Sequence, residues 1–219
     1  MKHIYLLLLG LSVYSQNLQI NSGGSITVLN EAKITLGNVT VASGGSITAS
    51  ENAEITLENI NVNENGSFTL KNASLTVAGE HNGDGNITYI KTLDNSKWTS
   101  ISSPVQGQSV STFATRTNLE SGLGGGNNNR GLVSYNNAAN NWDIYQQGSE
   151  DWGNFVPGKA YLIKLGGSGG NISFEGKVPD SNVAFNSVNN DVSYQGANVE
   201  NTLHFVGNPF PSYIDVNKN

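Results

Sequence analysis

Apolar and polar residues alternate along the first third of the chain, and the alternation recurs with a fixed period. Near-copies of one segment lie end to end over residues 18–38, 39–59 and 60–79. Within the first copy, Ile26 and Val28 flank a threonine, and such period-two alternation predicts strands with one buried face. A Gly-Gly or Asn-Gly pair precedes this run at the same place in every copy, which suits a turn that needs a positive φ.

A single copy is too short to bury its own apolar face, whereas stacked copies can bury theirs against one another. The pattern therefore predicts an all-β chain that begins with a short right-handed β-solenoid of about three 21-residue coils over residues 16–85. Three strand-like runs in each copy predict three short strands per coil. The run at residues 85–93 is expected to add a partial fourth coil or a lid.

The 21-residue period is lost from about His81, and the rest of the chain alternates short strand-like runs with turn-rich stretches. Many short strands at close spacing predict a β-sandwich-like domain over residues 86–219. A short helix is expected at Ser109–Thr117, and a long exposed loop at Ser121–Arg130. The predicted strands are Asn86–Leu93, Lys97–Ser102, Gly131–Tyr135, Trp142–Tyr145, Lys159–Leu165, Asn171–Phe174, Asp191–Tyr194 and Thr202–Val206.

Composition indicates an exported protein. The first 15 residues place Lys2 before an apolar run and end in the small residue Ser15, as a cleavable secretory signal peptide does. The run is too short to span a membrane, and no other segment is apolar enough to do so. A net charge of −6 argues against a nucleic-acid partner, and the absence of cysteine excludes disulfides.

Motifs of the second half resemble a module of secreted and surface proteins of Bacteroidota. The most specific of them is GNPFPSYID at Gly207–Asp215, and the motifs together span roughly residues 97–216. In that family the module often precedes a C-terminal sorting domain for type IX secretion, and the proteins are described as adhesin-like, without a catalytic role. The resemblance implies further chain beyond Asn219, so we expect the domain over residues 86–219 to be C-terminally truncated.

Clustered aromatic side chains are the first candidate for ligand contact. Tyr145, Trp142, Trp152 and Tyr161 lie within a short stretch, and exposed rings of this kind can stack on sugars. The alternative is that Trp142 and Tyr161 belong to the core of the sandwich and that Trp152 covers one of its edges.

A calcium site is the second candidate. Asn82, Asp84 and Asn86 alternate with glycines, like the front of a calcium-binding loop, but the bidentate glutamate that would complete such a loop is absent. The alternative is an ordinary turn between two domains. His81 and His204 have no metal-ligand spacing around them, so we expect no catalytic or metal-binding role for either.

These observations favour a secreted or cell-surface structural, adhesin-like protein without catalytic activity or an obligate cofactor, whose partner is an extracellular glycan or surface protein. A carbohydrate-binding module that uses the clustered aromatics is the alternative. A β-helix polysaccharide lyase or hydrolase is the third possibility, because paired carboxylates on a coil face could act on a sugar chain. Rows of outward serine and threonine on the coils are the natural polar residues of strands.

Overall fold

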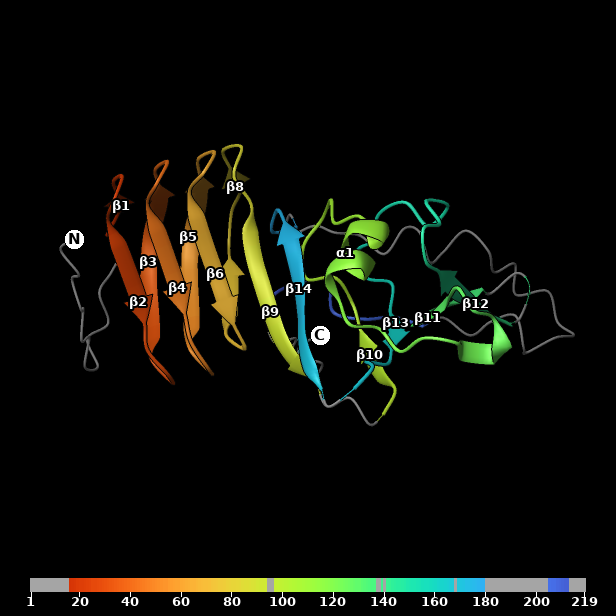
Figure 1. The fold of residues 1–219 in the computed structure, drawn as a ribbon. Helices are drawn as coiled ribbons and strands as arrows, with labels where there is room; N and C mark the ends of the chain where they lie inside the picture. The colour runs from red at the N-terminus through yellow and green to blue at the C-terminus, as the bar shows by residue number, and fades with distance from the viewer. Residues whose placement is uncertain are drawn as a thin grey trace, which may run out of the picture.

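The computed structural model describes residues 16–93, 97–136, 139, 141–167, 169–179 and 205–212. The fold is all-β as predicted: a short β-solenoid is followed by a second part that contains an antiparallel sheet (Figure 1). The predicted signal peptide, the predicted strand at Asp191–Tyr194 and residues 202–204 of the last predicted strand lie outside the described residues. None of the described helices is long and apolar enough to cross a membrane.

Two sheets form the solenoid, and successive coils add one strand to each. Sheet A contains β1 (Leu18–Ile20), β3 (Lys33–Val41), β5 (Glu54–Val62), β7 (Ser74–Val77) and β8 (His81–Asn82). Sheet B contains β2 (Ser25–Val28), β4 (Ser46–Ala49), β6 (Ser67–Lys71), β9 (Ile87–Leu93) and β14 (Gly170–Gly176).

Stacking of the coils places like residues on like. In sheet B, Ile26 pairs with Ile47 and Ile47 with Phe68, in parallel register. Phe68 then pairs with Ile87 of β9, so β9 supplies the predicted partial fourth coil. The side chains of Ile47, Phe68 and Ile87 are buried, because these rows face the interior between the two sheets.

The first two coils have two strands each rather than the three that the sequence predicted, whereas in the last coil β6, β7 and β8 are three separate strands. The runs at Ile34–Leu36 and Val39–Val41 belong to one nine-residue strand, β3, and β5 is continuous in the same way. The backbone does not turn between the two runs, although a charged or amide pair interrupts the hydrophobic alternation there. The interruption marks a shift in burial along one strand, so the prediction of three separate strands is wrong for these two coils.

The paired turn residues have two different tasks. Gly44 has a φ of 75°, in the left-handed region that a side chain disfavours. Gly45 instead lies against the previous coil, where an added Cβ would be only 2.8 Å from the carbonyl oxygen of Ile20. The first residue of each pair thus provides the turn, and the second allows neighbouring coils to approach closely.

The second part contains a four-stranded antiparallel sheet, with the strand order β10-β13-β11-β12. These strands are β10 (Thr99–Ile101), β11 (Asn129–Asn136), β12 (Asn141–Gln146) and β13 (Tyr161–Ile163). The predicted short helix is confirmed as α1 (Val110–Arg116), where the Ser109 side chain accepts a hydrogen bond from the backbone nitrogen of Thr112 as N-cap. The predicted loop contains a 3-10 turn, η1 (Leu123–Gly125), and is largely exposed.

Strand β14 joins the two parts. It pairs antiparallel with β9 along its full length, from Gly170↔Leu93 to Gly176↔Ile87, and so closes the end of sheet B (Figure 1). Its Phe174 stacks on Phe113 of α1 at a centroid distance of 4.8 Å and meets Phe155 edge-on at 5.5 Å. The solenoid and the second part therefore share one hydrophobic core, and sheet B continues across the domain boundary predicted at residue 85.

Candidate functional site

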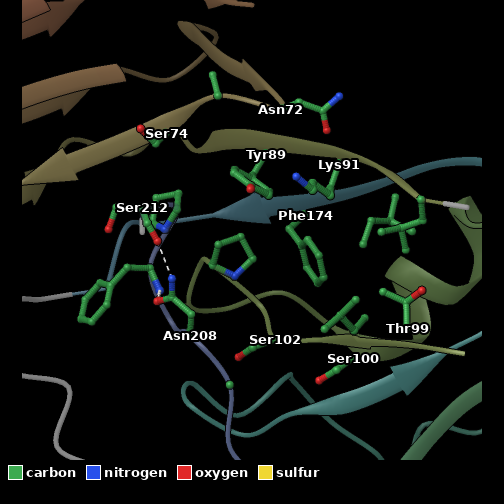
Figure 2. Close-up of a pocket in the computed structure, with 18 residues that line it drawn as sticks. Asn72, Ser74, Tyr89, Lys91, Thr99, Ser100, Ser102, Phe174, Asn208 and Ser212 are labelled. Atoms are coloured by element: carbon green, nitrogen blue, oxygen red, sulfur yellow. Dashed lines mark hydrogen bonds between the residues drawn. The ribbon is translucent and has the colours of Figure 1, made fainter. Parts of the chain in front are cut away.

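A cleft of about 350 Å³ lies where the solenoid meets the second part (Figure 2). It arises because the two sheets of the solenoid end at different heights. Sheet A ends at β7 and β8, whereas sheet B continues through β9 and β14. The inner face of these two extra strands has no sheet A strand opposite it, and β10 and the segment at residues 207–212 stand over it instead.

The floor of the cleft is apolar, and its rim is polar. Ile172 and Phe174 of β14 form the buried floor, with Tyr89 of β9 beside them (Figure 2). Hydroxyl and amide groups surround this floor, from the β6–β7 turn, from β10 and from residues 207–212. They belong to Asn72, Ser74, Thr99, Ser100, Ser102, Asn208 and Ser212.

Lys91 is the one charged residue among those that line the cleft. Its side chain is exposed, and the ion pairs of the described residues involve other lysines and arginines. A lysine that no carboxylate of the described residues pairs with is notable in a chain with a net charge of −6. The cleft therefore offers a cation beside an apolar, ring-bearing surface.

The GNPFPS motif builds one wall of the cleft. The Asn208 side chain accepts a hydrogen bond from the backbone nitrogen of Phe210 at 2.9 Å and donates to the carbonyl oxygen of Ser212, which fixes a tight turn. The carbonyl oxygen of Pro211 then accepts a 2.7 Å hydrogen bond from the backbone nitrogen of Leu75, on the otherwise free edge of β7. The motif that carried the family resemblance thus fastens the second part to the last coil.

The predicted calcium-loop residues lie on the exposed turn that leads into β9. Asn82, Asp84 and Asn86 are all exposed, and no three His, Cys, Asp or Glu side chains gather among the described residues. The ammonium of Lys177 donates to the carbonyl oxygens of Gly83 and Gly85, the latter at 2.7 Å. A protein cation therefore already occupies two backbone oxygens of this turn, and a calcium ion there stays a prediction.

His81 is a structural residue at the same junction. Its Nδ1 accepts a 2.9 Å hydrogen bond from the backbone nitrogen of Val178. The pKa of His81 is lowered to about 4, first by burial and then by the charge of Lys177, while the nearby Gly85 backbone offsets part of the effect. Nε2 has no hydrogen-bond partner among the described residues. The neutral imidazole is thus the form that fits this junction.

The four predicted aromatic residues separate into two groups. Tyr145 and Tyr161 are core residues, with 1% and 3% of their surface exposed, and the half-buried ring of Trp152 packs against both. The Tyr161 hydroxyl accepts a hydrogen bond from the backbone nitrogen of Val156, and burial raises the pKa of Tyr161. Tyr161 is thus a core residue, as the alternative prediction had it, and Tyr145 is buried with it.

Trp142 lies apart from the other three and is 43% exposed. It meets Tyr135 edge-on at 5.2 Å, as its cross-strand partner on β11, and Phe205 at 5.5 Å. Phe205, which sequence reasoning did not select, is brought beside Trp142 because the backbone nitrogen of Ala160 donates to its carbonyl oxygen. Trp142 is therefore the predicted ring that remains open to stacking.

The fold and the cleft define a class: an all-β protein in which a capped solenoid carries a second sheet at its end. A family model described as a domain of unknown function, DUF8693, matches residues 13–219, and the chain belongs to this family. The match spans both the solenoid and the second part, in agreement with their shared core. No curated protein and no solved structure matches the chain.

Proposed function

We propose that this chain is a non-catalytic structural or adhesive module of an exported protein, displayed outside the cell. The observation that carries the proposal is the continuity of sheet B, from β2 in the first coil to β14 against the second part. A shared sheet and core make the unit stiff, because a bend between the parts would break the pairing of β14 with β9. Stiffness suits a module that holds a binding surface away from a cell.

Polar ladders along the coils support a role outside the cell. Asn59 Nδ2 donates to Asn38 Oδ1 at 2.7 Å, and Asn38 Nδ2 donates to Asn17 Oδ1 at 3.0 Å. These bonds run along the stack, where they reinforce the backbone pairing without any disulfide. The apolar segment at residues 4–13 and the motifs at residues 97–216 further support export, and we extend the proposal to type IX secretion in Bacteroidota on that resemblance.

The experiment is to locate the protein and measure attachment. An epitope inserted between Gly148 and Ser149, in an exposed turn after β12, leaves both sheets intact. We expect an antibody to reach the epitope on intact cells, and we expect deletion of the gene to reduce attachment to a glycan- or protein-coated surface. An epitope that is reached only after lysis, or unchanged attachment, would contradict the proposal.

Carbohydrate binding at Trp142 is a second candidate, favoured by the exposure of its ring beside Tyr135 and Phe205. Base or sugar stacking on one aromatic ring contributes on the order of 1–3 kcal/mol. Trp98 provides a matched control, since it is 42% exposed on the same part of the molecule. A glycan-array signal that is lost in Trp142→Ala and kept in Trp98→Ala would establish this site, and equal effects of the two substitutions would exclude it.

A further inference from the structure

The junction cleft has the chemical character of a site for an acidic ligand. Among the described residues, Lys91 is the charged residue of its lining, and no aspartate or glutamate lines it. In the surrounding acidic chain, such a position would attract an anion by charge complementarity. The volume of about 350 Å³ falls within the roughly 300–1,000 Å³ typical of ligand pockets.

The remaining lining indicates the chemical nature of the uncharged part of such a ligand. Tyr89 presents a ring beside Lys91, and Thr99 projects from β10 on the side of the cleft, whereas the next residue, Ser100, points to the opposite side (Figure 2). The Oγ atom of Ser102, at the edge of the cleft, is buried without a hydrogen-bond partner among the described residues. A ring, several small hydroxyls and one cation are complementary to a molecule that is itself rich in hydroxyls and carries a carboxylate.

A peptide fits this cleft less well than a sugar does. An extended peptide gains most of its affinity by adding a strand to a free sheet edge. The free edge of β7 beside the cleft is already engaged, since the carbonyl oxygen of Pro211 accepts the hydrogen bond of Leu75 there. Side-chain hydroxyl and amide groups make up much of the polar lining, and such groups suit the hydroxyls of a sugar.

From these observations we propose that the junction cleft binds an acidic saccharide, whose carboxylate is held by the ammonium of Lys91. The saccharide is one to two rings of a uronate-type chain, with its flat face toward Tyr89. This site is separate from Trp142, which lies on β12. It goes beyond the proposed display role, because it names a ligand class and a position for it.

The test is calorimetric titration of the purified chain with di- and trigalacturonic acid. The matched ligand is the same oligosaccharide with its carboxyl groups methyl-esterified, which removes the charge and keeps the rings. Lys91→Gln removes the cation, and Lys71→Gln is the control, since Lys71 is an exposed lysine of the neighbouring strand that does not line the cleft. A second variant, Thr99→Trp, places a bulky ring in the cleft from β10.

We expect the acid to bind and the ester to bind at least about tenfold more weakly, since a hydrogen bond to a charged group contributes about that factor. Lys91→Gln should weaken binding by a similar factor, Thr99→Trp should abolish it, and Lys71→Gln should leave it unchanged. No binding of the acid, equal loss in both lysine variants, or equally tight binding of the dipeptide Ala-Glu would overturn the proposal. The titration uses purified protein, so its failure is distinct from a failure of export or attachment.

Discussion

Replacing Gly45 by alanine tests the close approach of neighbouring coils. The added Cβ would lie 2.8 Å from the carbonyl oxygen of Ile20, 3.1 Å from that of Ala42 and 3.2 Å from that of Asn21. All three atoms are backbone atoms held in the sheet hydrogen-bonding pattern, so the clash cannot be relieved by a side-chain rotation. Overpacking of this kind costs about 1–3 kcal/mol, and we expect the upper end here.

Gly23→Ala is the control that separates crowding from backbone strain. Gly23 has a φ of 75°, but an added Cβ there would meet nothing within 4 Å. This substitution should therefore cost only the strain of a left-handed alanine, about 1 kcal/mol. The difference in unfolding free energy between the two variants, about 2 kcal/mol, measures the cost of crowding an added Cβ against the neighbouring backbone.

Urea unfolding followed by circular dichroism measures both values. A lower midpoint with an unchanged slope would show that stability changed without a change in the surface exposed on unfolding. If Gly45→Ala costs no more than Gly23→Ala, the coils do not approach one another as closely as described, and the explanation of the paired turn residues fails.

The other predictions concern the ladders, the junction histidine and the shared core. Asn38→Ala should lower the unfolding free energy by about 1 kcal/mol, because two ladder hydrogen bonds are lost; unchanged melting would show that the ladder contributes nothing. The lowered pKa of His81 means that the unfolded chain binds the extra proton between about pH 6.5 and 4, so stability should fall as the pH drops through that window. Partial exposure reduces the effect to about 1–2 kcal/mol, and His81→Gln should abolish that part of the pH dependence in thermal melts; an unaltered profile would refute it. Phe174→Ala should cost about 3–5 kcal/mol by cavity formation in chemical denaturation, and a cost below that of an exposed-site control would contradict the shared core.

The repeat made the solenoid predictable from sequence, because its alternation is enforced at identical positions in stacked coils. The run Ile26-Thr27-Val28 could belong only to a strand with one buried face, and the structure confirms it in β2. The number of strands per coil was not predictable in the same way. Whether the chain turns between Leu36 and Val39 depends on pairing with the adjacent coils, and the pairing of β3 with β5 on both sides of Gly37 keeps it one strand.

The junction could not be predicted, since it depends on contacts between residues far apart in the chain. Strand β14 has the same local pattern as any half-buried strand, and nothing in its sequence indicates that it pairs with β9 rather than with its own sheet. The cleft follows from that pairing, so Lys91 and Tyr89 could not be singled out as site residues. A lysine two residues beyond a tyrosine on a strand is a common surface pattern.

The aromatic residues show the same limit at a finer scale. Trp142 and Tyr145 lie three residues apart on one strand, so they belong to opposite faces of the sheet. Alternation could therefore predict that one of them is buried, but the packing of Trp152 and Phe155 against Tyr161 decides which. The exposed ring could be identified only once those contacts were known.

Equilibrium unfolding followed by two probes tests the central claim that the solenoid and the second part form one stiff unit. All three tryptophans, Trp98, Trp142 and Trp152, lie in the second part, so their fluorescence reports on that part alone. Amide hydrogen exchange of β3 and β5, followed by mass spectrometry, reports on the coils. The shared sheet predicts that the two transitions coincide at one denaturant concentration. Loss of the tryptophan signal while β3 and β5 stay protected would show that the second part unfolds by itself, and would contradict the account.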